Sequence, residues 1–147
     1  MKVEGLTERL AAVRLRIERA AERARRDPSE VLLLAVTKIF PAAAIRDAYD
    51  LGLRDFGENY VQEFEGKAPE VAALPGARFH LIGHLQSNKA AKATEIFHAV
   101  DSIDSAKLAQ RLNDAAQKLN MTLDTLIEIN VGGEDAKSGL DPDSAEI

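Results

Sequence analysis

Apolar residues recur with helical spacing in the first segment of this chain. Up to Arg26 they stand four and three residues apart, at Leu6, Leu10, Val13, Ile17, Ala20 and Ala24. This spacing places them on one face of an amphipathic helix. We expect the helix to end at Asp27-Pro28-Ser29, because a helix usually ends at or before the residue that precedes a proline.

From residue 31 onward, short apolar runs alternate with helical patterns. Strands are expected at residues 31–36, 53–56, 78–82, 96–100 and 125–131. Helices are expected from Pro41 to Gly52, through about Val71, after a cap at Ser87 or Asn88, and from Asp104 or Ser105 to Leu119. Residues 143–147 indicate the start of a further helix.

Five such βα units predict an α/β protein with a parallel sheet. Two architectures fit this pattern. One is a complete flavodoxin-like doubly wound sheet, and the other is the first part of a (β/α)8 barrel, that is, a partial TIM barrel preceded by an N-terminal helix. Periodicity does not decide between them.

Composition narrows the classes of function. The chain has 147 residues, the length of one domain, and no cysteine, which excludes disulfides, thiolate nucleophiles and cysteine-ligated zinc. Its net charge of -5 argues against a general nucleic-acid binder. No run approaches the roughly 18 apolar residues of a membrane span, and no secretory signal precedes the first helix. We therefore expect a cytoplasmic protein with neither nucleic acid nor membrane as a partner.

Lys38 is the first candidate for chemistry. It follows the apolar run 31–36 and Thr37. A run that is apolar at successive positions is typical of a parallel strand buried on both faces. The carboxyl ends of such strands carry the chemistry of α/β folds. Burial there would lower the pKa of Lys38 and prepare its amine to form a Schiff base. The alternative is a lysine that extends to solvent at a strand end.

Other polar residues follow the second and third expected strands. His80 and His84 have the spacing of a helical metal site, but on an extended chain they lie about 13 Å apart, too far to share one metal, so no metal site is expected. His80 is interpreted as a packed strand residue. His84 is placed either in a pocket or at the surface, and Asn59 is either a pocket residue or a helix cap.

Several motifs resemble the pyridoxal phosphate homeostasis proteins (the YggS/PROSC-like family). They are Ala35-Val36-Thr37-Lys38 with Pro41, then Phe56-Gly57-Glu58-Asn59-Tyr60-Val61-Gln62-Glu63, then the run from Phe79 to Lys89. Asp101-Ser102 and Asn130-Val131-Gly132-Gly133-Glu134 continue the resemblance in the same order. Arg78 departs from it, because an aromatic residue is common at that position, and altered packing is expected there.

The resemblance implies a barrel similar to the N-terminal domain of alanine racemase, rather than a flavodoxin-like sheet. It implies that Lys38 holds pyridoxal 5'-phosphate as an internal aldimine, a Schiff base. Asn59 then lies beside the cofactor ring, and Ile82 and His84 line the same pocket. The implied function is intracellular vitamin B6 homeostasis without turnover, with apoenzymes that use the cofactor as recipients. A racemase or lyase of the same barrel type is the enzymatic alternative.

The resemblance also implies that relatives continue for roughly another third of a barrel, with the loops that bind the phosphate. Residues 1–147 are therefore expected to form a single, incomplete barrel domain, and a fragment that no longer binds the cofactor is a further alternative. Such an arc would expose two strand edges and bind the cofactor weakly. A monomer or a weak homo-oligomer is expected.

Overall fold

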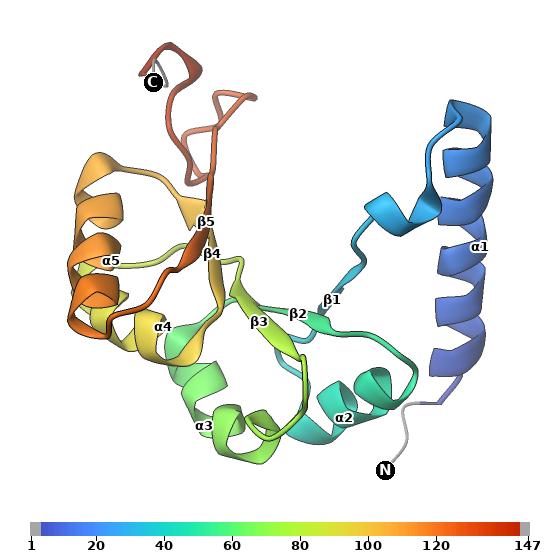
Figure 1. The fold of residues 1–147 in the computed structure, drawn as a ribbon. Coiled ribbons are helices and arrows are strands. Elements are labelled where there is room, and N and C mark those ends of the chain that lie inside the picture. The colour runs from blue at the N-terminus through green and yellow to red at the C-terminus, as the bar shows by residue number, and fades with distance from the viewer. Residues whose placement is uncertain (1–3, 145–147) are drawn as a thin grey trace.

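One parallel sheet organises the chain in the computed structural model, which describes residues 4–144 (Figure 1). The five strands pair in the order β1-β2-β3-β4-β5. They are β1 (Leu34–Val36), β2 (Asp55–Glu58), β3 (Arg78–Leu81), β4 (Ala99–Ile103) and β5 (Asp124–Ile127). A doubly wound sheet would reverse the order of its strands at a switch point. The uninterrupted order seen here is that of consecutive units in a (β/α)8 barrel.

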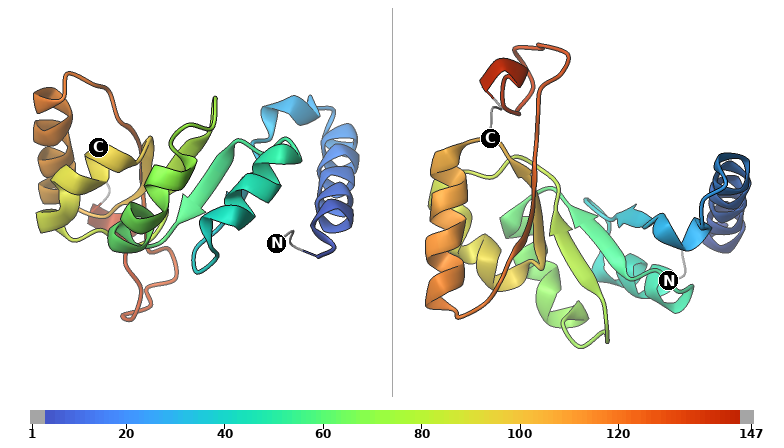
Figure 2. Two further views of the ribbon diagram at one scale, coloured as in Figure 1. Left: turned by 90° about the horizontal axis from the view of Figure 1, so that it is seen from below. Right: turned by 45° about the horizontal axis from the view of Figure 1, so that its top comes forward.

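Four helices cover the outer side of the curved sheet, and one stands beside its first edge (Figures 1 and 2). The outer helices are α2 (Ala42–Asp50), α3 (Val61–Val71), α4 (Ala90–Ile96) and α5 (Ala106–Lys118). The first helix, α1 (Leu6–Ala24), lies beyond β1, and short 3-10 turns occupy η1 (Pro28–Glu30), η2 (Ser87–Lys89) and η3 (Pro142–Ser144). Among the described residues, no helix is both long and apolar enough to cross a bilayer.

The core lies between the sheet and the outer helices. Phe79 of β3 packs against Phe56 of β2 and Phe64 of α3, with ring centroids 5.7 and 4.7 Å apart. Phe64 in turn packs on Phe97, at 4.8 Å. Aromatic pairs at these distances add packing energy beyond their buried area. This cluster fixes the outer face of β2 and β3, so alternate residues of these strands point to the inner face.

The first strand differs from the expectation. The structure has β1 only at Leu34–Val36, and Leu32 and Val36 are 62% and 48% exposed. The expected strand buried on both faces is therefore wrong. The reason is its place in the sheet: β1 is an edge strand with β2 as its one neighbour in the sheet. Apolar composition indicates a strand, but only the neighbours decide how much of it is covered.

The bounds of two other strands also differ from those expected. The strand expected at 96–100 is wrong at its start, because Ile96 ends α4 and the strand runs from Ala99 to Ile103. The strand expected at 125–131 ends at Ile127, and Ile129 makes only an isolated bridge with Leu140. Short apolar runs do not distinguish a strand from the last turn of a buried helix.

Helix ends follow the local signals in part. Ser105, one of the two residues expected to begin this helix, caps α5, and its hydroxyl accepts a hydrogen bond from the Leu108 amide at 3.2 Å. Ser87 and Asn88 lie inside η2, so the prediction that one of them caps the next helix is wrong. In α1 the buried residues are Leu10 and Ala21, whereas Ala20 and Ala24 of the predicted stripe are exposed. The helix expected at 143–147 begins as η3, and residues 145–147 lie outside the described part.

Candidate functional site

The carboxyl ends of β1, β2 and β3 lie side by side and carry the four predicted cofactor residues. Lys38 follows β1, Asn59 follows β2, and Ile82 and His84 follow β3. Two backbone hydrogen bonds hold these ends in register. The Thr37 amide donates to the Gly57 carbonyl and the Ile82 amide to the Glu58 carbonyl, each at 2.9 Å. The fold therefore gathers the candidates at the edge where barrels carry their chemistry.

Lys38 itself is exposed, in a turn after β1. The burial predicted for it is wrong, because β1 is an edge strand and nothing among the described residues covers its end. Within residues 4–144 the ammonium group makes no hydrogen bond and no ion pair. The amine is therefore accessible to a ligand without first leaving a protein partner. That accessibility suits a nucleophile for an aldehyde.

The turn that carries Lys38 has an unusual backbone. The Phe40 amide donates to the Thr37 carbonyl at 3.1 Å, which closes a four-residue turn. Ile39, at the third position of this turn, has φ of 63°, in the left-handed region. Type II turns place glycine there, and a β-branched residue is a genuine outlier. Strain of this kind costs about 1–3 kcal/mol and persists only where surrounding contacts hold it.

Those contacts come from a buried ionic group that we call the Lys67 cluster: Thr37, Glu58, Glu63 and Lys67. The Lys67 ammonium donates to both Glu58 carboxylate oxygens at 3.2 and 3.0 Å and to Glu63 Oε1 at 2.6 Å. The Glu58 side chain is fully buried and also accepts the Thr37 hydroxyl at 2.8 Å. A buried carboxylate is tolerated only when it is paired and hydrogen-bonded in this way.

The cluster also reaches the backbone on both sides of Lys38. The Lys67 ammonium donates to the Thr37 carbonyl at 3.1 Å, and the Ile39 amide donates to Glu63 Oε1 at 2.6 Å. The hydrogen bond from Lys67 is the main reason why the pKa of Glu63 lies below its usual range; burial opposes it, and the Ile39 amide adds a smaller lowering effect. Glu63 thus remains ionised where it contacts the turn.

Sequence reasoning missed the Lys67 cluster. Two signals for it were present: Glu58 is a charged residue directly after the apolar pair Phe56-Gly57, and Glu63 and Lys67 stand four residues apart on one helix. A charged residue in a buried strand requires a partner, and residues four apart on a helix share a face. The packing of α3 against the end of β2 is what brings Lys67 to Glu58 as its partner.

A close backbone approach joins the ends of β2 and β3. A Cβ atom on Gly83 would lie 2.9 Å from the Asn59 Cα, closer than real Cβ atoms come to backbone. The Ser102 hydroxyl of β4 donates to the Gly83 carbonyl at 2.7 Å and fixes the same segment from the other side. Glycine at this position therefore lets Asn59 and Ile82 lie at one strand edge.

His84 and His80 have separate partners. His84 is exposed, and its Nδ1 lies 3.0 Å from Oδ2 of Asp104. His80 is buried in β3, as predicted, with Nε2 3.1 Å from Asp55 and Nδ1 3.0 Å from Asp101. Among residues 4–144, no three His, Asp or Glu side chains are grouped as metal ligands would be.

The ionic contacts of Arg78 account for the charged residue at this position, where an aromatic residue is common. Arg78 begins β3, where its guanidinium contacts Asp55 at 3.7 Å and also bonds the Asp124 carboxylate of β5. An ionic layer formed by Asp55, Arg78, His80, Asp101 and Asp124 thus links β2 to β5 on the face away from the phenylalanine core. We interpret this layer as structural, because its members lie in the strands and not beyond their carboxyl ends.

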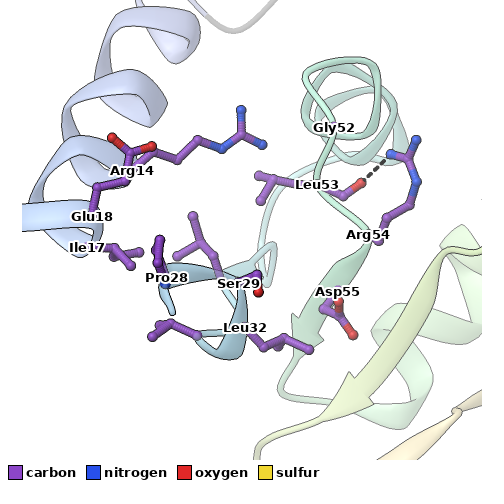
Figure 3. Close-up of a pocket in the computed structure, with 12 residues that line it drawn as sticks. Arg14, Ile17, Glu18, Pro28, Ser29, Leu32, Gly52, Leu53, Arg54 and Asp55 are labelled. Carbon is purple, nitrogen blue, oxygen red and sulfur yellow. Dashed lines mark hydrogen bonds between the residues drawn. The ribbon is translucent and has the colours of Figure 1, made fainter. Parts of the chain in front are cut away.

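A groove lies at the other end of the sheet, between α1 and the segment that leads into β2 (Figure 3). Arg14 and Glu18 of α1 line one side of it, and Leu53 and Arg54 line the other. Arg14 donates to the Leu51 carbonyl at 3.0 Å and bridges the two sides. The amino ends of barrel strands serve stability rather than chemistry, so this groove is not the candidate site.

Comparison with known proteins agrees with this geometry. The sequence model of the family described as "Alanine racemase, N-terminal domain" matches residues 9–147. Pyridoxal phosphate homeostasis proteins of Pseudomonas aeruginosa and Escherichia coli K12 are 48% and 44% identical over 138 and 140 residues. Each alignment covers 94% of this chain and 60% of the relative, so the chain spans about 60% of the length of these relatives.

The fold of this chain is also similar to that of solved structures. PipY of Synechococcus elongatus PCC7942, determined with pyridoxal phosphate bound, has a TM-score of 0.73 and 43% identity, covering 86% of this chain and 58% of that one. The form without the cofactor has a TM-score of 0.75 and 44% identity, covering 86% and 59%.

Proposed function

This chain belongs to the alanine racemase N-terminal domain family, and on that premise we propose that it binds pyridoxal 5'-phosphate with Lys38 as the covalent anchor. One observation carries the proposal: an exposed lysine amine, free of partners among residues 4–144, stands at the carboxyl end of the first barrel strand. The names of the relatives and the PipY structure with pyridoxal phosphate support it.

The chemistry that this amine can perform is simple. Bound cofactor would supply an aldehyde carbon. Lys38 Nζ, once unprotonated, would add to that carbon and form a carbon–nitrogen double bond, a Schiff base, while the carbonyl oxygen leaves as water. In this arrangement Asn59 offers an amide donor and acceptor, His84 an imidazole and Ile82 an apolar surface at the same strand edge. These residue types fit an aromatic ring with polar substituents.

The proposed role is the homeostasis of the cofactor rather than catalysis. The relatives named for that role support it. We infer that the recipients are apoenzymes that use pyridoxal phosphate, and that the protein acts in the cytoplasm. An assay for amino-acid racemisation or cleavage separates this role from the enzymatic alternative. Amino-acid turnover that depends on Lys38 would contradict the proposal.

The proposal is tested by trapping the linkage. The protein is incubated with pyridoxal phosphate, reduced with borohydride and digested, and the modified peptides are identified by mass spectrometry. We expect one dominant adduct, at Lys38, that is absent in Lys38→Ala. Lys107→Ala, which removes another exposed lysine on α5, is the matched control and should retain the adduct.

Lys38→Ala should fold normally, because an exposed side chain without partners contributes little. We expect the free energy of unfolding to change by less than about 0.5 kcal/mol in urea titrations. Labelling spread evenly over surface lysines, or an adduct that persists in Lys38→Ala, would refute the assignment of Lys38 as anchor.

A further inference from the structure

We propose that the Lys67 cluster positions the turn that presents Lys38, with Glu63 and Lys67 as positioning residues rather than groups that touch the ligand. The consequence for the cofactor rests on the function proposed above, but the structural claim does not. No hydrogen bond or ion pair joins the Lys38 side chain to the cluster within residues 4–144. It acts on the two residues that flank Lys38 in the chain.

Both flanks of Lys38 are anchored to this one cluster. On the near side, the Thr37 carbonyl accepts Lys67 at 3.1 Å and the Thr37 hydroxyl donates to Glu58 at 2.8 Å. On the far side, the Ile39 amide donates to Glu63 at 2.6 Å. The position of the Lys38 Cα is thereby determined from two directions. Its side chain has no hydrogen-bond or ion-pair partner in the described part of the chain.

The anchors matter because the turn's own hydrogen bond, from the Phe40 amide to the Thr37 carbonyl, must hold a strained residue. Ile39 adopts φ of 63° although its side chain is β-branched and 81% exposed, so no side-chain packing compensates for the strain. The hydrogen bond from the Ile39 amide to the ionised Glu63 carboxylate favours this conformation. Hydrogen bonds to charged groups are stronger than those between neutral groups. Without Glu63 we expect the turn to relax toward a conformation with negative φ at Ile39.

Control of the backbone matters here because the Lys38 side chain makes no hydrogen bond or ion pair within residues 4–144. The chain has further exposed lysines, such as Lys107 and Lys118, that are chemically equivalent amines. What distinguishes Lys38 is its place directly after β1, at the strand edge that also carries Asn59 and Ile82. A displacement of about 1 Å at such a site costs as much as a hundredfold in rate. The cluster is thus a determinant of which lysine reacts.

The test compares three variants of α3. Glu63→Ala removes the acceptor of the Ile39 amide, and Glu63→Gln keeps a side-chain oxygen at the same reach. Glu65→Ala, on the same helix, removes a surface carboxylate that contacts only Lys92 among the described residues, at 3.5 Å, and is the matched control. Two quantities are measured: hydrogen exchange of the Ile39 amide without cofactor, and the initial rate of pyridoxal phosphate trapping at Lys38 relative to Lys107.

Glu63→Ala should speed exchange of the Ile39 amide by about tenfold or more, because a charge-assisted hydrogen bond is lost. It should slow trapping at Lys38 by about tenfold while trapping at Lys107 stays constant. Glu63→Gln, which keeps the acceptor but not the charge, should recover part of both values, and Glu65→Ala should match the wild type. Unchanged exchange and trapping in Glu63→Ala would overturn the inference.

The wild-type protein provides an independent check if a variant fails to fold. The Ile39 amide should be protected, whereas the Lys38 amide, which donates no hydrogen bond within residues 4–144, should exchange freely. Equal exchange at the two positions would overturn the inference. Absence of trapping at Lys38 in the wild type, with Ile39 protected, would refute the proposed function and leave the positioning role standing.

Discussion

At the scale of single residues, chemistry depends on neighbours that are distant in sequence. His98, just before β4, shows this clearly. Its Nδ1 accepts the Phe79 amide at 3.1 Å, which requires an unprotonated nitrogen. Desolvation of the ring lowers the pKa of His98, and the nearby charges of Arg78 and His80 lower it further. The neutral ring is therefore the form that belongs to the folded protein.

We predict a loss of stability on mild acidification that is traceable to His98. Its folded pKa lies below the unfolded one, so the unfolded chain binds more protons as the pH falls through the ordinary histidine range near 6.5. The stabilisation that His98 contributes is present in full above that pH range and is lost below it. Urea midpoints between about pH 7.5 and 5.5 should fall less steeply in His98→Asn, whose amide oxygen can accept the Phe79 amide. An identical slope in both proteins would contradict this.

At the scale of elements, the site depends on how closely neighbouring strand ends approach. The segment after β3 passes close to the segment after β2 at Gly83, where a side chain would clash with the Asn59 backbone. Gly66, in the interior of α3, is the opposite case, because a Cβ there would touch nothing within 4 Å. The two glycines look alike in sequence. Only the strand packing distinguishes them.

We predict opposite effects for alanine at these two glycines. Gly83→Ala should destabilise the protein by about 1–3 kcal/mol, because the backbone of one strand end must move. Gly66→Ala should leave stability unchanged or raise it by about 0.5–1 kcal/mol, since alanine is the better helix former. Free energies of unfolding from urea titrations decide the matter. Equal effects at both sites would show that the close approach at Gly83 does not constrain the fold.

At the scale of the whole molecule, the sheet formed by residues 4–144 has two edges without a further strand. The edge strands are β1 and β5, and every residue of β5 is exposed. Leu126 and Ile127 are 62% and 46% exposed there. Unpaired backbone beside apolar side chains is a template for pairing with another chain. Of the two expected states, a monomer and a weak homo-oligomer, these edges favour the second as a prediction.

We therefore predict concentration-dependent self-association through β5. A charged side chain on an edge strand opposes such pairing, so Leu126→Lys should lower the weight-average mass at high concentration. Leu119→Lys, which alters an exposed leucine at the end of α5 instead, is the control and should not. Sedimentation equilibrium or light scattering gives the answer. If the two variants associate equally, the edge is not the contact.

The sequence by itself determined the βα alternation, the start of α5 at Asp104 or Ser105 and the place of Lys38 after the first strand. These features depend on periodicity and on residues within a few positions of one another. Only the tertiary structure decided that β1 is an exposed edge, that Glu58 pairs with Lys67, and that His80 lies between two carboxylates. Those outcomes depend on partners such as Thr37 and Glu58, 21 residues apart, which local patterns do not specify. Burial and charge pairing are properties of the packed neighbours, and the fold alone supplies them.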